Sequence, residues 1–142
     1  MEGYKHILVP VDGSQCSERA IEEAKRLQAS FGAKLTLLYV VSDPDFDVSM
    51  GNPTLSVASS KHEMKNAELY LKRCAESFEG EVDTKVVMGT IARKIIDEAS
   101  NLGCDLIVMG SLGLGSSLRR FLIGSVSQNV LSNTALPVLI VH

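Results

Sequence analysis

The feature that most constrains the fold is an alternation of short apolar runs with helical patterns along the chain. The runs are rich in β-branched residues and lie at 6–11, 34–41, 82–88, 105–109 and 136–141. Between them, apolar residues recur at helical spacing over 15–31, 61–79, 91–102 and from 124 onward. Strands that alternate with helices and are nearly continuously apolar predict a mainly parallel sheet with helices on both faces.

Right-handed crossovers make this pattern a doubly wound, Rossmann-like α/β domain with five strands, expected to span residues 1–142 as one unit. In such folds ligands bind beyond the carboxyl ends of the strands, where the strand order reverses. The segments after the first and fourth predicted strands, at 10–14 and 109–115, are therefore expected to face a ligand.

Composition and the missing motifs exclude several classes of protein. The formal net charge of −3 argues against a nucleic-acid-binding surface. No run of eighteen apolar residues or signal-peptide pattern occurs, so no membrane contact and a cytoplasmic location are expected. P-loop and nucleophile-elbow motifs are absent, and no carboxylate pair with a nearby histidine forms a clear acid–base site. No catalytic residue is assigned.

The cysteines and the longest aperiodic stretch indicate no metal site. Cys16, Cys74 and Cys104 are too dispersed for a disulfide framework or a zinc site and are expected to be buried or half-buried. A redox role for Cys16 would need a lowered pKa at a helix start. Residues 42–60 are predicted to form a solvated loop, with a nucleotide lid as the alternative. Their spaced aspartates lack the glycine and glutamate that a calcium loop needs.

The segment 110–128, GSLGLGSSLRRFLIGSVSQ, has several features of a phosphate-binding site. Its first glycines (Gly110, Gly113 and Gly115) free backbone amides to form an anion-binding nest. Gly124 and Ser125 open a helix whose amides and dipole favour negative charge, and Ser125 with Gln128 fits a capping box. Hydroxyl donors and positive charge come from Ser111, Ser116, Ser117, Ser125, Ser127, Arg119 and Arg120. The alternative is a flexible glycine-serine loop with a capped helix behind it.

The end of the first predicted strand supplies a second set of candidate residues. Asp12 precedes Gly13, and a carboxylate at this point accepts hydrogen bonds from a ribose hydroxyl or helps to hold a metal ion. The same Asp-Gly-Ser sequence is also a common turn that leads into a helix, and both interpretations stay open. Pro10, near the end of the strand, can present a flat apolar surface to a planar ligand.

Taken together, these residues resemble the universal stress protein family over nearly the whole chain. The likeness is carried by ILVPVDGSQCSERAIEEA at 7–24, KLTLLYVV at 34–41 and the long terminal block at 105–141. ATP-binding members carry G-x2-G-x9-G-[ST]. The two halves of this pattern match Gly110 to Gly113 and Gly124 to Ser125, but ten residues separate the halves here, one more than the pattern has. A wider loop absorbs the extra residue and can displace a phosphate donor.

The resemblance implies an adenine-nucleotide alpha-hydrolase-like fold that binds ATP together with Mg²⁺. It places adenine near Pro10, Val11 and Val40, and ribose at Asp12. The remaining nucleotide-binding residues are Met109, Gly110, Ser111, Gly113, Gly124, Ser125, Val126 and Ser127. It also implies a homodimer paired through the last strand, 136–141. The expected function is a cytoplasmic regulator or sensor in the stress response. Alternatives are a slow ATP hydrolase or autophosphorylating enzyme, and a dimeric interaction protein that binds no ATP or senses another adenine nucleotide.

Overall fold

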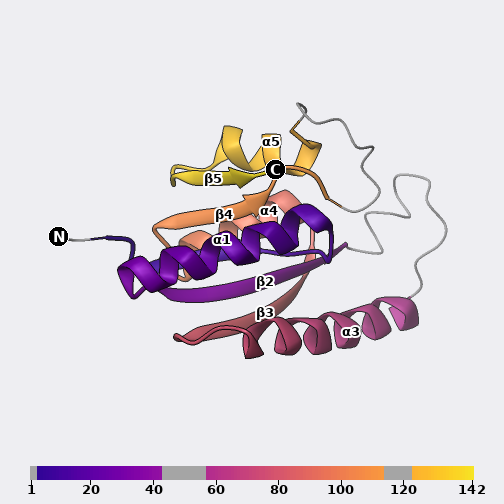
Figure 1. Ribbon diagram of the computed structural model, residues 1–142. Coiled ribbons are helices and arrows are strands. Elements are labelled where there is room, and N and C mark those ends of the chain that lie inside the picture. The colour runs from indigo at the N-terminus through magenta and orange to yellow at the C-terminus, as the bar shows by residue number, and fades with distance from the viewer. Residues whose placement is uncertain (1–2, 43–56, 114–122) are drawn as a thin grey trace.

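A five-stranded parallel sheet organises the chain in the computed structural model, which describes residues 3–42, 57–113 and 123–142 (Figure 1). The strands are β1 (His6–Pro10), β2 (Lys34–Ser42), β3 (Val82–Gly89), β4 (Leu106–Gly110) and β5 (Val138–Val141). The helices that connect them are α1 (Gln15–Phe31), α3 (Val57–Glu76), α4 (Ile91–Asn101) and α5 (Ser125–Asn133). Strand and helix alternate along the chain as the apolar pattern predicts.

The strands lie in the order β3-β2-β1-β4-β5, and all neighbouring pairs are parallel. The chain winds from β1 outward to β3 and then returns to the other side of β1 for β4 and β5. Strand order therefore reverses between β1 and β4, where Ile7 pairs with Leu35 on one side and Leu106 on the other. The predicted doubly wound fold is confirmed.

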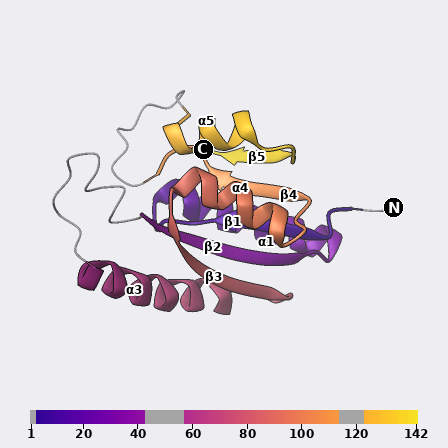
Figure 2. The ribbon, with the colours of Figure 1, turned by 180° about the vertical axis from the view of Figure 1, so that it is seen from behind.

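Two helical layers bury the two faces of the sheet. In Figure 1 α1 lies in front of the sheet, and the reverse view in Figure 2 brings α4 forward. Alternate side chains of β1 pack into the two helical layers. Ile7 and Val9 pack with α1, whereas Leu8 packs with Ile95 of α4. These side chains are fully or almost fully buried, as burial of both faces of a parallel sheet requires. No helix within the described ranges combines the length and apolar character needed to cross a membrane.

Helix ends differ from the predictions in two places. Helix α3 begins at Val57, inside the stretch predicted to be a loop, and residues 43–56 of that stretch lie outside the described part. The predicted capping box of α5 is wrong, because Gly124 is the N-cap and Ser125 is already helical. The Gln128 side-chain amide donates instead to the carbonyl of Ile123, at 3.0 Å. Helix α1 ends at Phe31, where the predicted helical pattern ends, and Gly32 follows as the C-cap with a left-handed φ of 67°.

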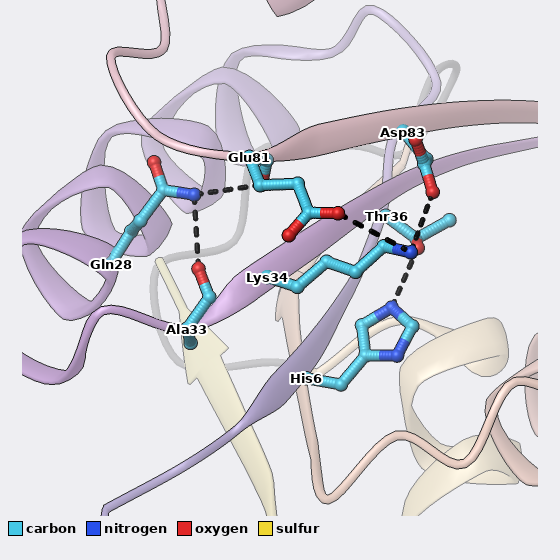
Figure 3. Close-up of polar contacts among 7 residues, drawn as sticks. All are labelled: His6, Gln28, Ala33, Lys34, Thr36, Glu81 and Asp83. Carbon is cyan, nitrogen blue, oxygen red and sulfur yellow. Dashed lines mark hydrogen bonds and ion pairs between the residues drawn. The ribbon is translucent and has the colours of Figure 1, made fainter.

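A buried glutamine joins three elements at the end of the sheet opposite the carboxyl ends of the strands (Figure 3). Nε2 of Gln28, on α1, donates to the carbonyls of Ala33 at 3.1 Å and Glu81 at 2.9 Å. These carbonyls precede β2 and β3, so one side chain fixes where both strands begin. Beside it, Lys34 forms ion pairs with Asp83 at 2.9 Å and with Glu81 at 3.8 Å.

We expect Gln28→Met to lower the free energy of unfolding by about 1–3 kcal/mol, because two carbonyls lose a donor while the side-chain length is kept. Urea unfolding followed by circular dichroism measures the change. The matched control is Gln15→Met, at an exposed position of the same helix, which should stay within about 0.5 kcal/mol of the wild type. Equal stability of the two variants would contradict this role for Gln28.

Candidate functional site

The segments that follow β1 and β4 meet at the point where strand order reverses. The hydroxyl of Ser14 donates to the carbonyl of Leu112 at 3.4 Å. A side-chain carbon added to Gly113 would lie 2.8 Å from Oδ2 of Asp12, so the carboxylate lies directly against this glycine. The sequence predicted that these two segments face one crevice, and the structure brings them together.

Asp12 makes the turn that leads into α1. Its Oδ1 accepts a hydrogen bond from the Ser14 amide at 2.9 Å. Ser14 is in turn the N-cap of α1, and its Oγ accepts from the Ser17 amide at 3.2 Å. Gly13 between them has φ of 84°, a conformation that favours glycine. The turn interpretation of Asp12 is therefore confirmed, and the same carboxylate also lines the crevice.

The crevice consists of two adjoining cavities. The inner cavity has a volume of about 100 Å³ and is lined by Pro10, Val11, Asp12, Ser14, Ser17, Leu38, Val40, Ile91, Ile95, Met109, Gly110, Leu112, Gly113, Val126 and Ser127. The outer cavity, of about 270 Å³, is lined by Asp12, Tyr39, Val40, Val41, Ser42, Glu63, Ile91, Gly113, Gly124, Ser125, Val126 and Ser127. The residues common to both linings mark the junction between the cavities: Asp12, Val40, Ile91, Gly113, Val126 and Ser127.

The two cavities differ in chemistry. The inner one is lined mainly by aliphatic side chains and suits a small planar apolar group. The outer one meets the N-terminus of α5, where the amides of the first turn have no acceptor within the helix and the helix dipole favours an anion. The arrangement therefore suits a ligand with an apolar ring at one end and negative charge at the other.

Most of the predicted nucleotide-binding residues that the structure describes line this crevice, and one of them does not. Ser111 is 1% exposed, and its hydroxyl lies 3.8 Å from the Cys16 sulfur, away from both cavities. Ser127 lines both cavities, but its hydroxyl donates to the carbonyls of Gly110 at 2.9 Å and Ser111 at 3.2 Å. The Ser111 hydroxyl therefore faces α1, and the Ser127 hydroxyl joins α5 to the end of β4, which differs from their predicted role as phosphate donors.

Comparison with known proteins agrees with this geometry. The sequence description of the universal stress protein family matches residues 3–142. The chain belongs to that family. Universal stress protein MJ0531 from Methanocaldococcus jannaschii is 34% identical over 140 residues, which cover 97% of this chain and 82% of the relative.

Solved structures of the family share the fold. The structure of MJ0577, another universal stress protein of Methanocaldococcus jannaschii, has a TM-score of 0.79 and 30% identity and covers 97% of this chain and 95% of its own. A universal stress protein solved in complex with cAMP has a TM-score of 0.66 and 25% identity. That comparison covers 98% of this chain and 97% of the neighbour.

In this universal stress protein Cys16 lies in the first turn of α1, against the wall of the crevice. Burial raises the pKa of its thiol, but hydrogen bonds from Ser111 and the Leu112 amide, together with Arg19, outweigh burial and leave the pKa below its ordinary value. Its side chain is nevertheless buried, as predicted for the cysteines: Cys104 is also buried and Cys74 is half-buried. Burial, followed by the negative charge of Asp105, raises the pKa of Cys104 to about 11.

Several lining residues of this universal stress protein were not predicted. Leu38 lies two residues before Val40 on the same face of β2, and strand alternation is a signal that would have found it. Ile91 and Ile95 are part of the recognised apolar stripe of α4, but only the structure shows that the stripe reaches the crevice. Glu63 on α3 had no signal in the sequence.

Part of the predicted phosphate segment lies in 114–122, outside the described residues: Gly115, Ser116, Ser117, Arg119 and Arg120. In the part of the universal stress protein that is described, no group of three or more histidine, cysteine or acidic side chains could hold a metal ion.

Proposed function

We propose that this universal stress protein binds an adenine nucleotide, ATP together with Mg²⁺, in the crevice between β1 and β4. One observation carries the proposal: an aliphatic inner cavity opens, at the Asp12 carboxylate, into an outer cavity at the N-terminus of α5. Adenine would lie in the inner cavity against Pro10, Val11, Val40 and Met109. The family relative solved with cAMP supports an adenine ligand.

Asp12 would hold the ribose, because it lies at the junction of the two cavities and carboxylates accept hydrogen bonds from hydroxyl groups. The phosphates would extend into the outer cavity. There they meet the backbone of Gly113 and the first turn of α5, whose residues line the cavity: Gly124, Ser125, Val126 and Ser127. Gly110 would shape the wall, and Ser111 would support it from behind.

Magnesium fits this arrangement as a companion of the nucleotide. Mg²⁺ is usually held by one or two carboxylates together with substrate phosphates. Asp12 and Glu63 are the carboxylates among the described residues that line the outer cavity. The cation would neutralise phosphate charge there. We therefore propose a binding role, a cytoplasmic regulator or sensor in the stress response whose nucleotide occupancy is the signal.

Isothermal titration calorimetry on protein stripped of nucleotide tests the proposal. Titration with MgATP, MgADP, AMP, cAMP and adenosine measures which adenine nucleotide binds, and MgGTP tests the base. We expect saturable binding of adenine compounds and weaker binding of MgGTP. No heat of binding with any adenine nucleotide at millimolar concentration would overturn the proposal. Comparing the affinities of ATP, ADP, AMP and adenosine also shows how many phosphates the site contacts, despite the ten-residue spacing between Gly113 and Gly124.

We also propose that the protein forms a homodimer through its last strand, 136–141. Strand β5 is an edge of the sheet and pairs only with β4 among the described strands. Its side chains are apolar, and Leu139 is 37% exposed. Such an edge favours pairing with another chain, and a two-fold axis closes that pairing into a dimer.

We expect Leu139→Arg to convert the dimer to a monomer, since a charge would have to be buried between the two edges. Size-exclusion chromatography with light scattering measures the mass of the wild type and the variant. Leu69→Arg is the matched control, because Leu69 is 50% exposed on α3, which packs at the β3 edge of the sheet and not at β5. A monomeric wild type, or a Leu139→Arg variant that keeps the dimer mass, would contradict the proposed interface.

A further inference from the structure

The outer cavity carries an unusual balance of charge for a phosphate-binding space. Its described lining includes two carboxylates, Asp12 after β1 and Glu63 on α3, and no lysine, arginine or histidine side chain. Asp12 is already assigned a role in the turn and at the ribose. Glu63 has no such role: it is an exposed residue of α3, and α3 otherwise packs against β2 and β3.

The two carboxylates act on the same space. Tyr39 lines the outer cavity with both of them. Its hydroxyl has a raised pKa, first because of burial and then because of the negative charges of Glu63 and Asp12. The negative field of both side chains thus reaches the wall of the cavity, where a bound phosphate chain would lie.

We propose that Glu63 is a specificity-determining residue that makes the crevice selective for a metal-bound nucleoside polyphosphate over the metal-free form. This inference rests on the proposed function. The Glu63 carboxylate repels a bare phosphate chain, whereas one Mg²⁺ ion removes two negative charges from that chain and supplies an attraction to the carboxylate. Adenosine carries no phosphate and does not experience the effect.

The expected size of the effect follows from the dimensions of the site. A cavity of about 270 Å³ is about as wide as the distance over which physiological salt screens charges, roughly 8 Å. Repulsion across it is therefore weakened but not abolished. We expect removal of one carboxylate charge to improve binding of metal-free ATP by about threefold to fivefold.

The experiment compares Glu63→Gln with Glu68→Gln, which removes the same charge from an exposed position of the same helix but does not line the cavity. Calorimetry measures the dissociation constants of adenosine, ATP with EDTA, and ATP with excess Mg²⁺. In Glu63→Gln the ratio of the metal-free to the magnesium-bound ATP dissociation constant should fall by at least about threefold to fivefold, with the adenosine constant unchanged. Glu68→Gln should keep the wild-type ratio, and added salt should reduce the difference.

The outcomes separate this inference from the proposed function. If the wild type binds ATP but Glu63→Gln keeps its ratio, or if Glu68→Gln changes the ratio equally, Glu63 does not set the selectivity and this inference alone is wrong. If Glu63→Gln also weakens the binding of adenosine, Glu63 shapes the crevice and does not discriminate between ligands by charge. If the wild type binds none of the ligands, the proposed function fails, and this inference fails with it.

Discussion

Replacing Asp12 by alanine is expected to weaken ATP binding by roughly tenfold to more than a hundredfold. The carboxylate lies at the junction of the inner and outer cavities, where the proposed ribose hydroxyls would donate to it. A hydrogen bond to a charged group contributes about 1.5–3 kcal/mol, which sets this range. Calorimetric titration with MgATP measures the loss directly.

Asparagine at the same position separates the ligand contact from the turn. In the wild type, Oδ1 of Asp12 accepts a hydrogen bond from the Ser14 amide at 2.9 Å. Asp12→Asn keeps a side-chain oxygen that can accept this hydrogen bond but removes the negative charge. We therefore expect near-native stability and an intermediate loss of affinity from Asp12→Asn, and reduced stability as well from Asp12→Ala. Wild-type affinity for ATP in both variants would exclude Asp12 from the binding site.

The second large effect is expected at Gly110, the last residue of β4. A side-chain carbon there would lie 2.7 Å from the carbonyl carbon and from Cβ of Cys16, and 2.9 Å from the Ser17 amide nitrogen. Backbone atoms in a helical turn cannot rotate away, so α1 and β4 would have to separate. We expect Gly110→Ala to lower the free energy of unfolding by about 3 kcal/mol, as measured by urea denaturation.

Gly124→Ala is the matched control for this prediction. The nearest atom to its added carbon is the Ser111 carbonyl oxygen at 3.2 Å, and its φ of −68° is accessible to alanine. Gly124 is the N-cap of α5, where alanine is a poorer residue, so we expect a loss of about 1 kcal/mol or less. If Gly110→Ala is no more destabilising than Gly124→Ala, the close approach of β4 to α1 is not what requires glycine.

Local periodicity explains why so much of the fold was predictable. Runs such as 6–11 and 34–41 are apolar on both faces, and only a parallel sheet between two helical layers buries both. Chain order then limits the arrangement, because right-handed crossovers leave few ways to connect five such strands. The predicted boundaries of α1, at 15 and 31, agree with the structure, because Ser14 and Gly32 give specific signals at its two ends.

The contents of the crevice were less predictable, because they depend on contacts between distant segments. Glu63 reaches the outer cavity from α3, and no local pattern marks one exposed glutamate of a helix as different from another. Ser111 and Ser127 looked like phosphate donors from their position in a glycine-rich segment. Only the packing of α1 and α5 against the end of β4 shows that their hydroxyls point into the protein.

The cap of α5 illustrates the same limit on a smaller scale. Ser125 and Gln128 have the spacing of a capping box, but the helix begins one residue earlier than that motif requires. The Gly124 amide donates to the Ser111 carbonyl at 2.7 Å, which fixes the N-cap at the glycine. A tertiary hydrogen bond has overridden a local sequence preference.

Ser111 has a further consequence, since it joins the wall of the crevice to the edge of the sheet. Its amide donates to the carbonyl of Val141 at 2.8 Å, and its own carbonyl accepts from the Gly124 amide. Nearby, the guanidinium of Arg19 donates to the carbonyl of His142 at 2.6 Å and to the sulfur of Cys16. Fraying of residues 138–142 would therefore remove hydrogen-bond partners from Ser111 and Arg19, which lie behind the wall of the crevice. We expect the stability of this last strand to influence how well the crevice is formed before a ligand binds.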